Sequence, residues 1–310
     1  MKLAFVFPGQ GSQSVGMLDS FADSAAANDI VRRADAALGQ SISTLIARGP
    51  AEELALTVNT QPAMLTASLA MWAAWREAGG AMPAVMAGHS LGEYSALTAS
   101  GVFALEDAVR LVRFRAQAMQ DSVPVGTGIM AAILGLSDDL VQQACDEAAQ
   151  GEVVEAVNFN APSQVVIAGH KAAVERACEV AKRLGAKRAL PLAVSAPFHS
   201  SLLKPASAQL AARLSSTPMQ APQAPVINNI DVGVETDPDL IRDALARQAA
   251  GPVRWAQIIA RMASEGVTHV VECGPGKVLS GLTKRIAPSV ESLSISDLAS
   301  LRETFARLAN

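Results

Sequence analysis

Residues 84–100 of this 310-residue chain, AVMAGHSLGEYSALTAS, carry the clearest indication of its fold class. It begins with an apolar run of strand character, passes through GHSLG (88–92), and continues with helix character up to Gly101. A strand, a tight glycine turn and a helix form the context of a nucleophile elbow, which presents a serine hydroxyl above a sheet. Ser90 is therefore the candidate nucleophile, and an accidental Gly-Ser-Gly turn is the alternative.

The same alternation of strand and helix character recurs at both ends of the chain. LAFVF (3–7) precedes a helical region, and VTHVVEC (267–273) precedes VLSGLTKRI (278–286). Apolar strands that alternate with longer amphipathic segments are typical of an α/β fold with a mainly parallel sheet. We expect a large α/β body built on such a sheet.

The middle of the chain, residues 125–193, follows a different order of elements. The pattern predicts β-α-β-β-α-β, with strands and helices in IMAAILGL (129–136), LVQQACDEAA (140–149), VVEAVNFN (153–160), QVVIAG (164–169), AAVERACEVAKRLG (172–185) and ALPLAVS (189–195). That order is the one of a ferredoxin-like unit. We therefore expect a small subdomain at 125–193, inserted into a large body at 1–124 and 194–310, with a ligand cleft between them.

A serine nucleophile needs a base, and the chain has four histidines. His199, in SAPFHS (195–200), lies at the junction of a predicted strand and a predicted helix, where catalytic side chains are commonly held. His89 lies in the elbow itself, where its ring is expected to point away from Ser90. The two others fit structural positions, a helix start and a strand interior: His170 and His269. His199 is the leading candidate.

Arg115 lies in the predicted helix LEDAVRLVRFRAQAMQ (105–120). It is nine residues from Glu106, so the helical period turns it about 180° away, onto the apolar side. A buried guanidinium needs an anion, and its planar fork suits a carboxylate. A ligand carboxylate and an internal salt bridge with a core acid are both open.

Two glycine-rich loops follow predicted strands. FPGQGSQ (7–13) is no dinucleotide fingerprint, because Ser14 stands where the third glycine belongs. Its glycines would instead let backbone approach a reacting centre, with the Gln10 N–H completing an oxyanion hole. GPGK (274–277) joins a strand to a helix, where a plain turn is preferred over a phosphate site.

The role of three sets of side-chain amides cannot be decided from their spacing in the sequence. They lie at Asn160, at Gln248 and in VINNID (226–231), a predicted strand. Amides of this kind either line a polar pocket or satisfy buried backbone groups.

Composition excludes several classes of protein. Half of the residues are hydrophobic and the net charge is −4, so no basic stripe for nucleic acid is present. No span reaches the roughly 20 apolar residues of a transmembrane helix, and Pro8 cuts the N-terminal run too short for a signal peptide. We expect a cytoplasmic enzyme with no membrane partner.

The chain has three cysteines, which lack metal-ligand spacing and are expected to be buried thiols: Cys145, Cys178 and Cys273.

Seven motifs together resemble the malonyl-CoA:acyl carrier protein transacylases over essentially the whole chain. They are FPGQGSQ, GHSLGEYSAL, the Arg of FRAQAM, VNFNAPSQVVIAG, SAPFHS, QAAGPVRW and ECGPGKVLSGL. The resemblance extends to the acyltransferase domains of polyketide and fatty acid synthases. It implies an α/β-hydrolase-like large subdomain with an inserted ferredoxin-like one, and transfer of malonyl from coenzyme A to acyl carrier protein for fatty acid synthesis.

The resemblance also implies residue roles. Ser90 is acylated, His199 acts as general base and then acid, and Arg115 clamps the free malonyl carboxylate. The backbone N–H groups of Gln10 and Leu91 form the oxyanion hole. In this family a main-chain carbonyl orients the histidine in place of a triad aspartate, and here it matches Gln248.

Three further positions carry less specific implications. Asn160 matches a position near the substrate. Phe198, before the histidine, resembles the malonyl-selective members and disfavours a branched methylmalonyl group. Ala116 departs from the glycine that the family often has after the clamp arginine, a small change because alanine favours helix.

The implied partners are malonyl-CoA and the phosphopantetheine of acyl carrier protein, with no metal and no redox cofactor, and a monomer is the family's usual form. Two enzyme alternatives remain: an acyltransferase of polyketide synthesis, and a serine esterase or thioesterase. A carrier-protein binding module without catalysis is the third alternative, and the intact elbow argues against it.

Overall fold

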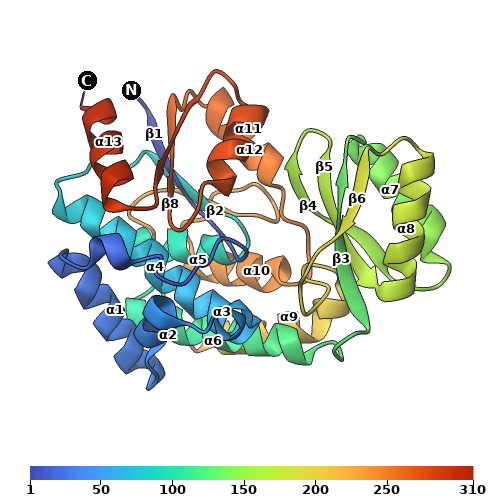
Figure 1. Cartoon of the computed structure of the whole chain (residues 1–310), viewed down its shortest axis with the longest axis horizontal. Coiled ribbons are helices and arrows are strands. Elements are labelled where there is room, and N and C mark those ends of the chain that lie inside the picture. Colours follow the sequence, from blue (N-terminus) through green and yellow to red (C-terminus); the bar gives the residue numbers. More distant parts are fainter. Residues whose placement is uncertain (310) are drawn as a thin grey trace.

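The structure is a computed structural model that describes residues 1–309. Its main body is built on a five-stranded, all-parallel sheet in the order β7-β2-β1-β8-β9 (Figure 1). The strands are β1 (Leu3–Phe7), β2 (Val85–Gly88), β7 (Val226–Ile227), β8 (His269–Cys273) and β9 (Glu291–Ile295). The prediction of an α/β fold with a parallel sheet is confirmed.

Helices cover both faces of this sheet. They are α1 (Ala25–Leu38), α2 (Ile42–Arg48), α3 (Ala51–Ala55), α4 (Thr57–Glu77), α5 (Leu91–Ala99), α6 (Leu105–Asp121), α9 (Lys204–Ser215), α10 (Pro238–Gln248), α11 (Trp255–Ser264), α12 (Val278–Ile286) and α13 (Leu298–Leu308), with short 3-10 turns η1 (Asp19–Phe21) and η2 (Ser201–Leu203).

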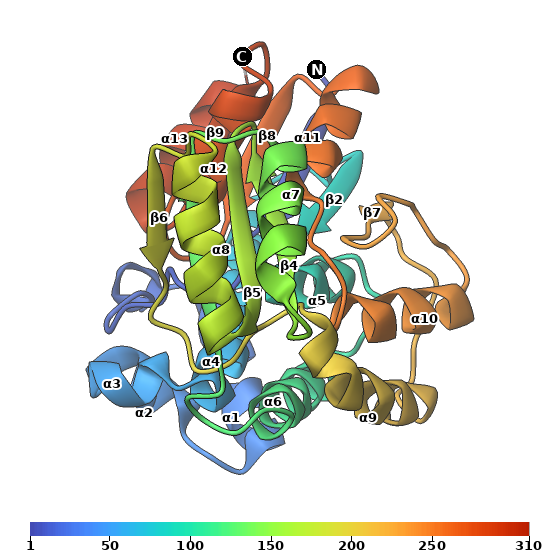
Figure 2. The ribbon, with the colours of Figure 1, turned by 90° about the vertical axis from the view of Figure 1, so that its right-hand side faces the viewer.

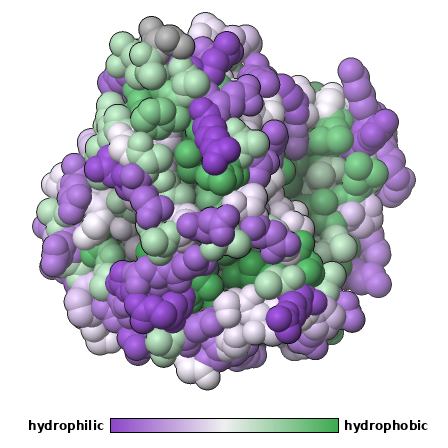
Figure 3. Space-filling model, turned by 60° about the vertical axis from the view of Figure 1, so that its left-hand side comes forward, coloured by the Kyte–Doolittle hydropathy of each residue, from purple (hydrophilic) through white to green (hydrophobic). Residues whose placement is uncertain are grey.

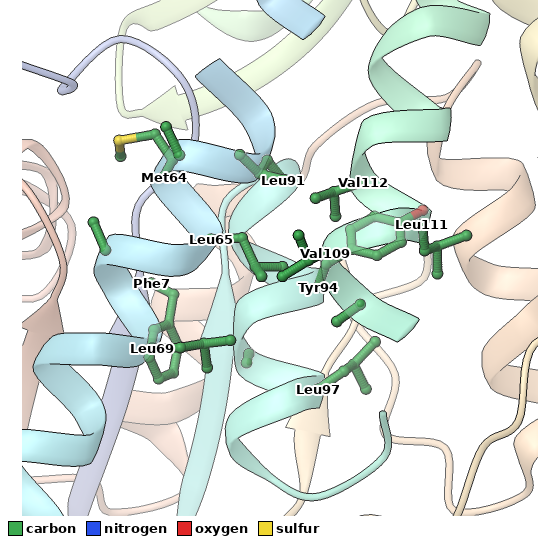
Figure 4. Packing of buried hydrophobic residues seen from close by; sticks show 14 of the residues in the cluster. Phe7, Met64, Leu65, Leu69, Leu91, Tyr94, Leu97, Val109, Leu111 and Val112 are labelled. Atoms are coloured by element: carbon green, nitrogen blue, oxygen red, sulfur yellow. The ribbon is translucent and has the colours of Figure 1, made fainter. Parts of the chain in front are cut away.

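Strand β1 is apolar throughout because each of its faces meets a different core. Phe5 and Phe7 point into the cluster that includes α4, α5 and α6, whereas Ala4 and Val6 point into the cluster with α11 and α12. Alternate residues of a strand lie on opposite faces, so a strand covered on both sides must be apolar at every position. Figure 4 shows Phe7 beside Leu69 of α4 on the first face.

Helix α4 is buried on nearly all sides, against α1, α5 and α6. Its sequence therefore shows no apolar stripe, and it carries buried polar residues such as Gln61 and Thr66. Such a helix runs through the centre of the main body. It delivers the amide of Gln61 to the region of the Ser90 elbow.

A second, four-stranded antiparallel sheet lies beside the main body, in the order β4-β5-β3-β6. We call it, with its two helices, the small sheet unit: β3 (Gly128–Leu134), α7 (Asp138–Ala149), β4 (Val154–Ala161), β5 (Gln164–His170), α8 (Lys171–Arg183) and β6 (Arg188–Pro191). Figure 2 shows α7 and α8 on its outer face. The strand order is ferredoxin-like, as predicted.

Two predicted strands are shorter in the structure. Only Val226 and Ile227 of VINNID pair with the sheet, because Asn228 turns the chain: its Oδ1 accepts the N–H of Asp231 at 2.8 Å. The predicted strand 189–195 ends at Pro191, since the next residues cross back to the main body. Both corrections concern segments that leave a sheet to approach the Ser90 elbow.

The surface mixes polar and apolar groups. On the face shown in Figure 3, hydrophilic side chains separate the apolar areas. Within residues 1–309, no helix is both long enough and apolar enough to cross a bilayer.

Candidate active site

Ser90 lies in a strained turn between β2 and α5. Its φ of 53° and ψ of −110° fall outside the regions that L-residues favour. Asn229 brackets the turn: its Oδ1 accepts the Ser90 N–H at 2.7 Å, and its Nδ2 donates to the Gly88 carbonyl at 2.7 Å. Gly92 is required because a Cβ there would lie 2.0 Å from the Phe7 carbonyl oxygen. This is the elbow geometry that the sequence predicts.

His199 is the partner of this hydroxyl. Its Nε2 lies 2.7 Å from Ser90 Oγ, and its Nδ1 lies 2.9 Å from the Gln248 carbonyl oxygen. A carbonyl can only accept a hydrogen bond, so Nδ1 carries the proton and Nε2 is free to accept the Ser90 proton. The structure thus brings together three predicted residues from distant parts of the chain.

The surroundings keep the His199 ring neutral. The ring is 4% exposed, and burial lowers its pKa from the ordinary 6.5 to about 3, with the positive charge of Arg115 as the next cause. Its hydrogen bond to the Gln248 carbonyl opposes this shift. A neutral imidazole is the form that can take a proton from the serine.

Arg115 is 2% exposed and points from α6 at the same hydroxyl. Its guanidinium donates to Gln61 Oε1 at 2.8 Å, to Gln248 Oε1 at 3.0 Å and to Ser90 Oγ at 3.2 Å. It also lies over the Tyr94 ring, 5.3 Å from the centroid. All these partners are uncharged, and within residues 1–309 no carboxylate forms an ion pair with it. The internal salt bridge that the sequence left open is therefore absent.

A cavity of about 140 Å³ opens over Ser90. Gln10, Leu91 and Phe198 line it with the residues above, and Met130 and Asn158 contribute from the small sheet unit. Among the described residues, nothing accepts a hydrogen bond from the N–H of Gln10 or of Leu91. Two free N–H groups beside a serine hydroxyl can stabilise a negative oxygen. The part of the chain that the structure describes contains no cluster of His, Cys, Asp and Glu suited to a metal ion.

Asn160 lies next to the cavity rather than in its wall. Its Oδ1 is 2.8 Å from His89 Nε2, and the His89 ring lies 5.5 Å from the centroid of Trp255. Burial lowers the pKa of His89, so the ring is neutral there. Asn158, which the sequence did not single out, takes the wall position.

The other two histidines have structural positions, as expected. His170 is the N-cap residue of α8, and its Nδ1 accepts the Val153 N–H at 2.9 Å. His269 lies in β8, with its Nε2 3.3 Å from Glu291 Oε2.

The turn at 274–277 is no phosphate site. The buried carboxylate of Glu272 accepts the N–H groups of Leu279 and Ser280, at 3.1 and 2.7 Å, and so occupies the N-terminus of α12. An anion from outside would meet this charge first. The plain turn that we preferred is what the structure contains.

Two polar residues of the elbow region were missed by sequence reasoning, Gln61 and Glu93, whereas Asn229 is one of the VINNID amides whose role the sequence left open. Glu93 is buried, and its Oε2 accepts the Asn229 N–H and Gln248 Nε2, both at 2.9 Å. Burial raises its pKa to about 7, against the opposing effect of these bonds. The available signal was a polar residue inside an otherwise buried helix, which marks a site without naming its partners.

The family model described as "Acyl transferase domain" matches residues 4–301. A malonyl CoA-acyl carrier protein transacylase of Salmonella typhimurium is 55% identical over 304 residues, 97% of each chain. The crystal structure of an acyl-carrier-protein S-malonyltransferase from Burkholderia pseudomallei is 64% identical, with a TM-score of 0.97 over 99% of this chain and 100% of that one.

A third relative was solved with a carrier. It is the malonyl-transacylase of a complex with its type II PKS acyl-carrier protein, 48% identical, with a TM-score of 0.97 over 99% of this chain and 100% of that one. These matches span the elbow, the small sheet unit and the C-terminal helices alike. The chain belongs to the acyl transferase family and, within it, to the malonyl CoA-acyl carrier protein transacylases.

Proposed function

We propose that this chain transfers the malonyl group from malonyl-CoA to the phosphopantetheine thiol of acyl carrier protein, through an ester on Ser90. The observation that carries the proposal is the Arg115 guanidinium, which is buried 3.2 Å from the Ser90 hydroxyl oxygen and has no acidic partner among residues 1–309. A buried cation at that position suits an acyl group that carries its own carboxylate. We propose that Arg115 is the malonyl clamp.

In the first half of the reaction, His199 Nε2 accepts the hydroxyl proton while Ser90 Oγ attacks the thioester carbonyl. The tetrahedral oxygen takes the negative charge between the N–H groups of Gln10 and Leu91. When the intermediate collapses, the C–S bond breaks and the coenzyme A sulfur takes the proton from His199. The products are free coenzyme A and malonyl-Ser90.

The second half reverses the roles. The carrier thiol gives its proton to His199 as its sulfur attacks the ester carbonyl, and Ser90 Oγ leaves with that proton. The Gln248 carbonyl holds the His199 tautomer through both halves. Every proton and electron pair in this sequence comes from the two substrates and the side chains named, so the reaction as written uses no metal or redox cofactor.

Two residues have supporting roles in this proposal. Phe198 lines the cavity beside His199, where its ring limits the room for a branched acyl group. Asn160 acts through His89, the elbow residue before Ser90. The Asn160 Oδ1 lies 2.8 Å from His89 Nε2 and so holds the orientation of that ring.

The carrier is an acyl carrier protein of fatty acid synthesis in this proposal, for which the chain supplies extender units. One relative, 48% identical, was solved with a type II PKS acyl-carrier protein, so a polyketide carrier is the second candidate. Transfer rates to the two holo carriers at equal concentration decide between them.

The central experiment is the intact mass of the protein after incubation with malonyl-CoA, followed by mapping of the modified residue. We expect one malonyl group on Ser90, none on Ser90→Ala, and transfer to added holo carrier. Modification at any other residue would overturn the assignment of the nucleophile. Free malonate in place of malonyl carrier would identify a hydrolase instead.

A further inference from the structure

Glu93 is a buried carboxylate that the proposed reaction does not use. It lies in the first turn of α5, three residues after Ser90, and is 2% exposed. Its Oε2 binds two donors from other parts of the chain, Asn229 after β7 and Gln248 at the end of α10. A carboxylate is costly to bury unless its charge and oxygens are satisfied, so its retention here needs a reason.

The bond to Asn229 stabilises the Ser90 turn. The Asn229 backbone N–H donates to Glu93, while the Asn229 side chain holds the Gly88 carbonyl and the Ser90 N–H. A residue at positive φ persists only where its surroundings hold it. Glu93 therefore holds Asn229 in place, and Asn229 in turn holds the Ser90 turn.

The bond to Gln248 stabilises the rest of the site. The Gln248 side chain accepts from Arg115 through Oε1 and donates from Nε2 to Glu93 and to the Ser90 carbonyl. A cation on one side and a carboxylate on the other leave this amide only one orientation. The backbone carbonyl of the same residue binds His199.

We propose that Glu93 is a positioning residue for acyl transfer. Its carboxylate aligns Ser90, His199 and Arg115 through its hydrogen bonds to Asn229 and Gln248. Its negative charge also weakens the binding of the acyl carboxylate to Arg115. This inference rests on the proposed function. The Gln248 amide bridges the two charged groups, since its Oε1 accepts from Arg115 at 3.0 Å and its Nε2 donates to Glu93 at 2.9 Å, so the two opposite charges lie one amide apart. A malonyl carboxylate is a second anion at the same guanidinium, so the Glu93 charge weakens its binding.

Two substitutions separate the two effects. Glu93→Gln removes the charge but keeps an oxygen that can accept the bonds from Asn229 and Gln248. Its new NH₂ group would face the small cavity that Asn228 and Glu235 line. Glu93→Ala removes both the bonds and the charge. Glu235→Gln is the matched control, because it removes a nearby negative charge that has no bond to Asn229 or Gln248.

The measurement is single-turnover acylation of Ser90 by malonyl-CoA and by acetyl-CoA at about pH 8.5, where Glu93, with a pKa of about 7, is ionised, over a range of donor concentrations. We expect Glu93→Ala to acylate about 100-fold more slowly with both donors, since an ångström of misalignment costs that much. Glu93→Gln should recover most of this maximal rate. It should also reach half-saturation at a several-fold lower malonyl-CoA concentration, with no change for acetyl-CoA. Glu235→Gln should match the wild type in both the maximal rate and the half-saturating concentration.

Each contrary outcome overturns the proposal. Wild-type rates in Glu93→Ala would exclude positioning, and an unchanged malonyl-CoA half-saturation in Glu93→Gln would exclude the charge effect. If Glu93→Ala does not fold, Glu93→Asp tests positioning, because its shorter side chain keeps the charge but draws the carboxylate back from Asn229 and Gln248; wild-type rates in this variant would exclude positioning. Glu93→Gln tests the charge effect by itself, because only that effect separates malonyl-CoA from acetyl-CoA. Failure of the proposed function is distinct, since the wild type would then form no acyl-Ser90.

Discussion

At the scale of single residues, the site depends on three charge states that burial sets. Among the described residues no carboxylate contacts the Arg115 cation. Burial holds His199 neutral and raises the pKa of Glu93 to about 7. In bulk water these groups would have their ordinary pKa values, but in a buried site the low dielectric constant keeps the pKa values shifted. The consequence is a base that is ready to accept a proton and a cation that is ready to accept a carboxylate.

Arg115→Ala should change which donor the protein prefers. Two charge-assisted hydrogen bonds to a carboxylate are worth about 3–6 kcal/mol together, so kcat/KM for malonyl-CoA should fall by roughly 100-fold or more. Acetyl-CoA has no carboxylate, and its kcat/KM should change far less. Arg110→Ala is the control, since this exposed side chain of α6 contacts the Ala37 carbonyl and the Asp107 carboxylate and is not among the residues that line the cavity over Ser90. An unchanged malonyl-to-acetyl ratio in Arg115→Ala would contradict the clamp.

The acylation rate should resist acid. An ordinary histidine base loses half its activity near pH 6.5, but the lowered pKa of His199 moves that loss to lower pH, because protonation of the buried ring beside Arg115 is unfavourable. With saturating malonyl-CoA, so that changes in binding do not enter, the single-turnover rate should stay level from about pH 8 to about pH 5. A fall with a midpoint near 6.5 would show instead that the ring is solvated in the complex with malonyl-CoA.

At the scale of elements, the elbow depends on the close approach of α5 to β1 and β2. Gly88 and Gly92 leave no room for a side chain, because Cβ atoms there would lie 1.9 and 2.0 Å from backbone atoms of the neighbouring segment. The Phe7 carbonyl also accepts the His89 N–H at 3.0 Å. Backbone packed against backbone cannot relax as a side chain does, so the turn has one shape.

Two glycine-to-alanine substitutions should therefore have opposite effects on the free energy of unfolding. Gly92→Ala drives a methyl group into the Phe7 carbonyl and should cost about 3 kcal/mol or more, or prevent folding. Gly281→Ala, inside α12 with no atom within 4 Å of the new Cβ, should stabilise by about 0.5–1 kcal/mol. Urea unfolding measures both. Equal effects would mean that backbone contact at the elbow is not the constraint.

At the scale of the whole molecule, the site lies where the small sheet unit meets the main body. We propose residues 125–193 as a small subdomain within a body formed by 1–124 and 194–310, of which residue 310 lies outside the described residues. A separate core between its sheet and its two helices supports this division. Backbone hydrogen bonds tie β4 to the main body: Phe159 N–H to the Val253 carbonyl at 2.9 Å, and Val253 N–H to the Val157 carbonyl at 2.8 Å.

Glu155 should affect catalysis from outside the cavity. From β4, its Oε2 accepts the N–H of Ser201 at 2.7 Å and so holds the turn that carries His199. Glu155→Ala should slow single-turnover acylation about tenfold with both malonyl-CoA and acetyl-CoA, because the base loses its alignment. Glu155→Gln keeps an acceptor and should recover the rate. Glu152→Ala is the control, since Glu152 pairs with Arg176 inside the small sheet unit. A wild-type rate in Glu155→Ala would refute this link.

Features that are local in the chain could be predicted from the sequence alone. The elbow at Ser90, the order β-α-β-β-α-β and the inward face of Arg115 all depend on neighbours a few residues apart, where turn chemistry and helical period apply. Which distant groups meet became apparent only from the packing of the folded chain. His199 and Gln248 join Ser90 across 109 and 158 residues, and Glu93 and Asn229 join each other across 136. A buried polar group must find a partner, but its spacing in the chain does not say which one, because packing of separate elements brings the two together.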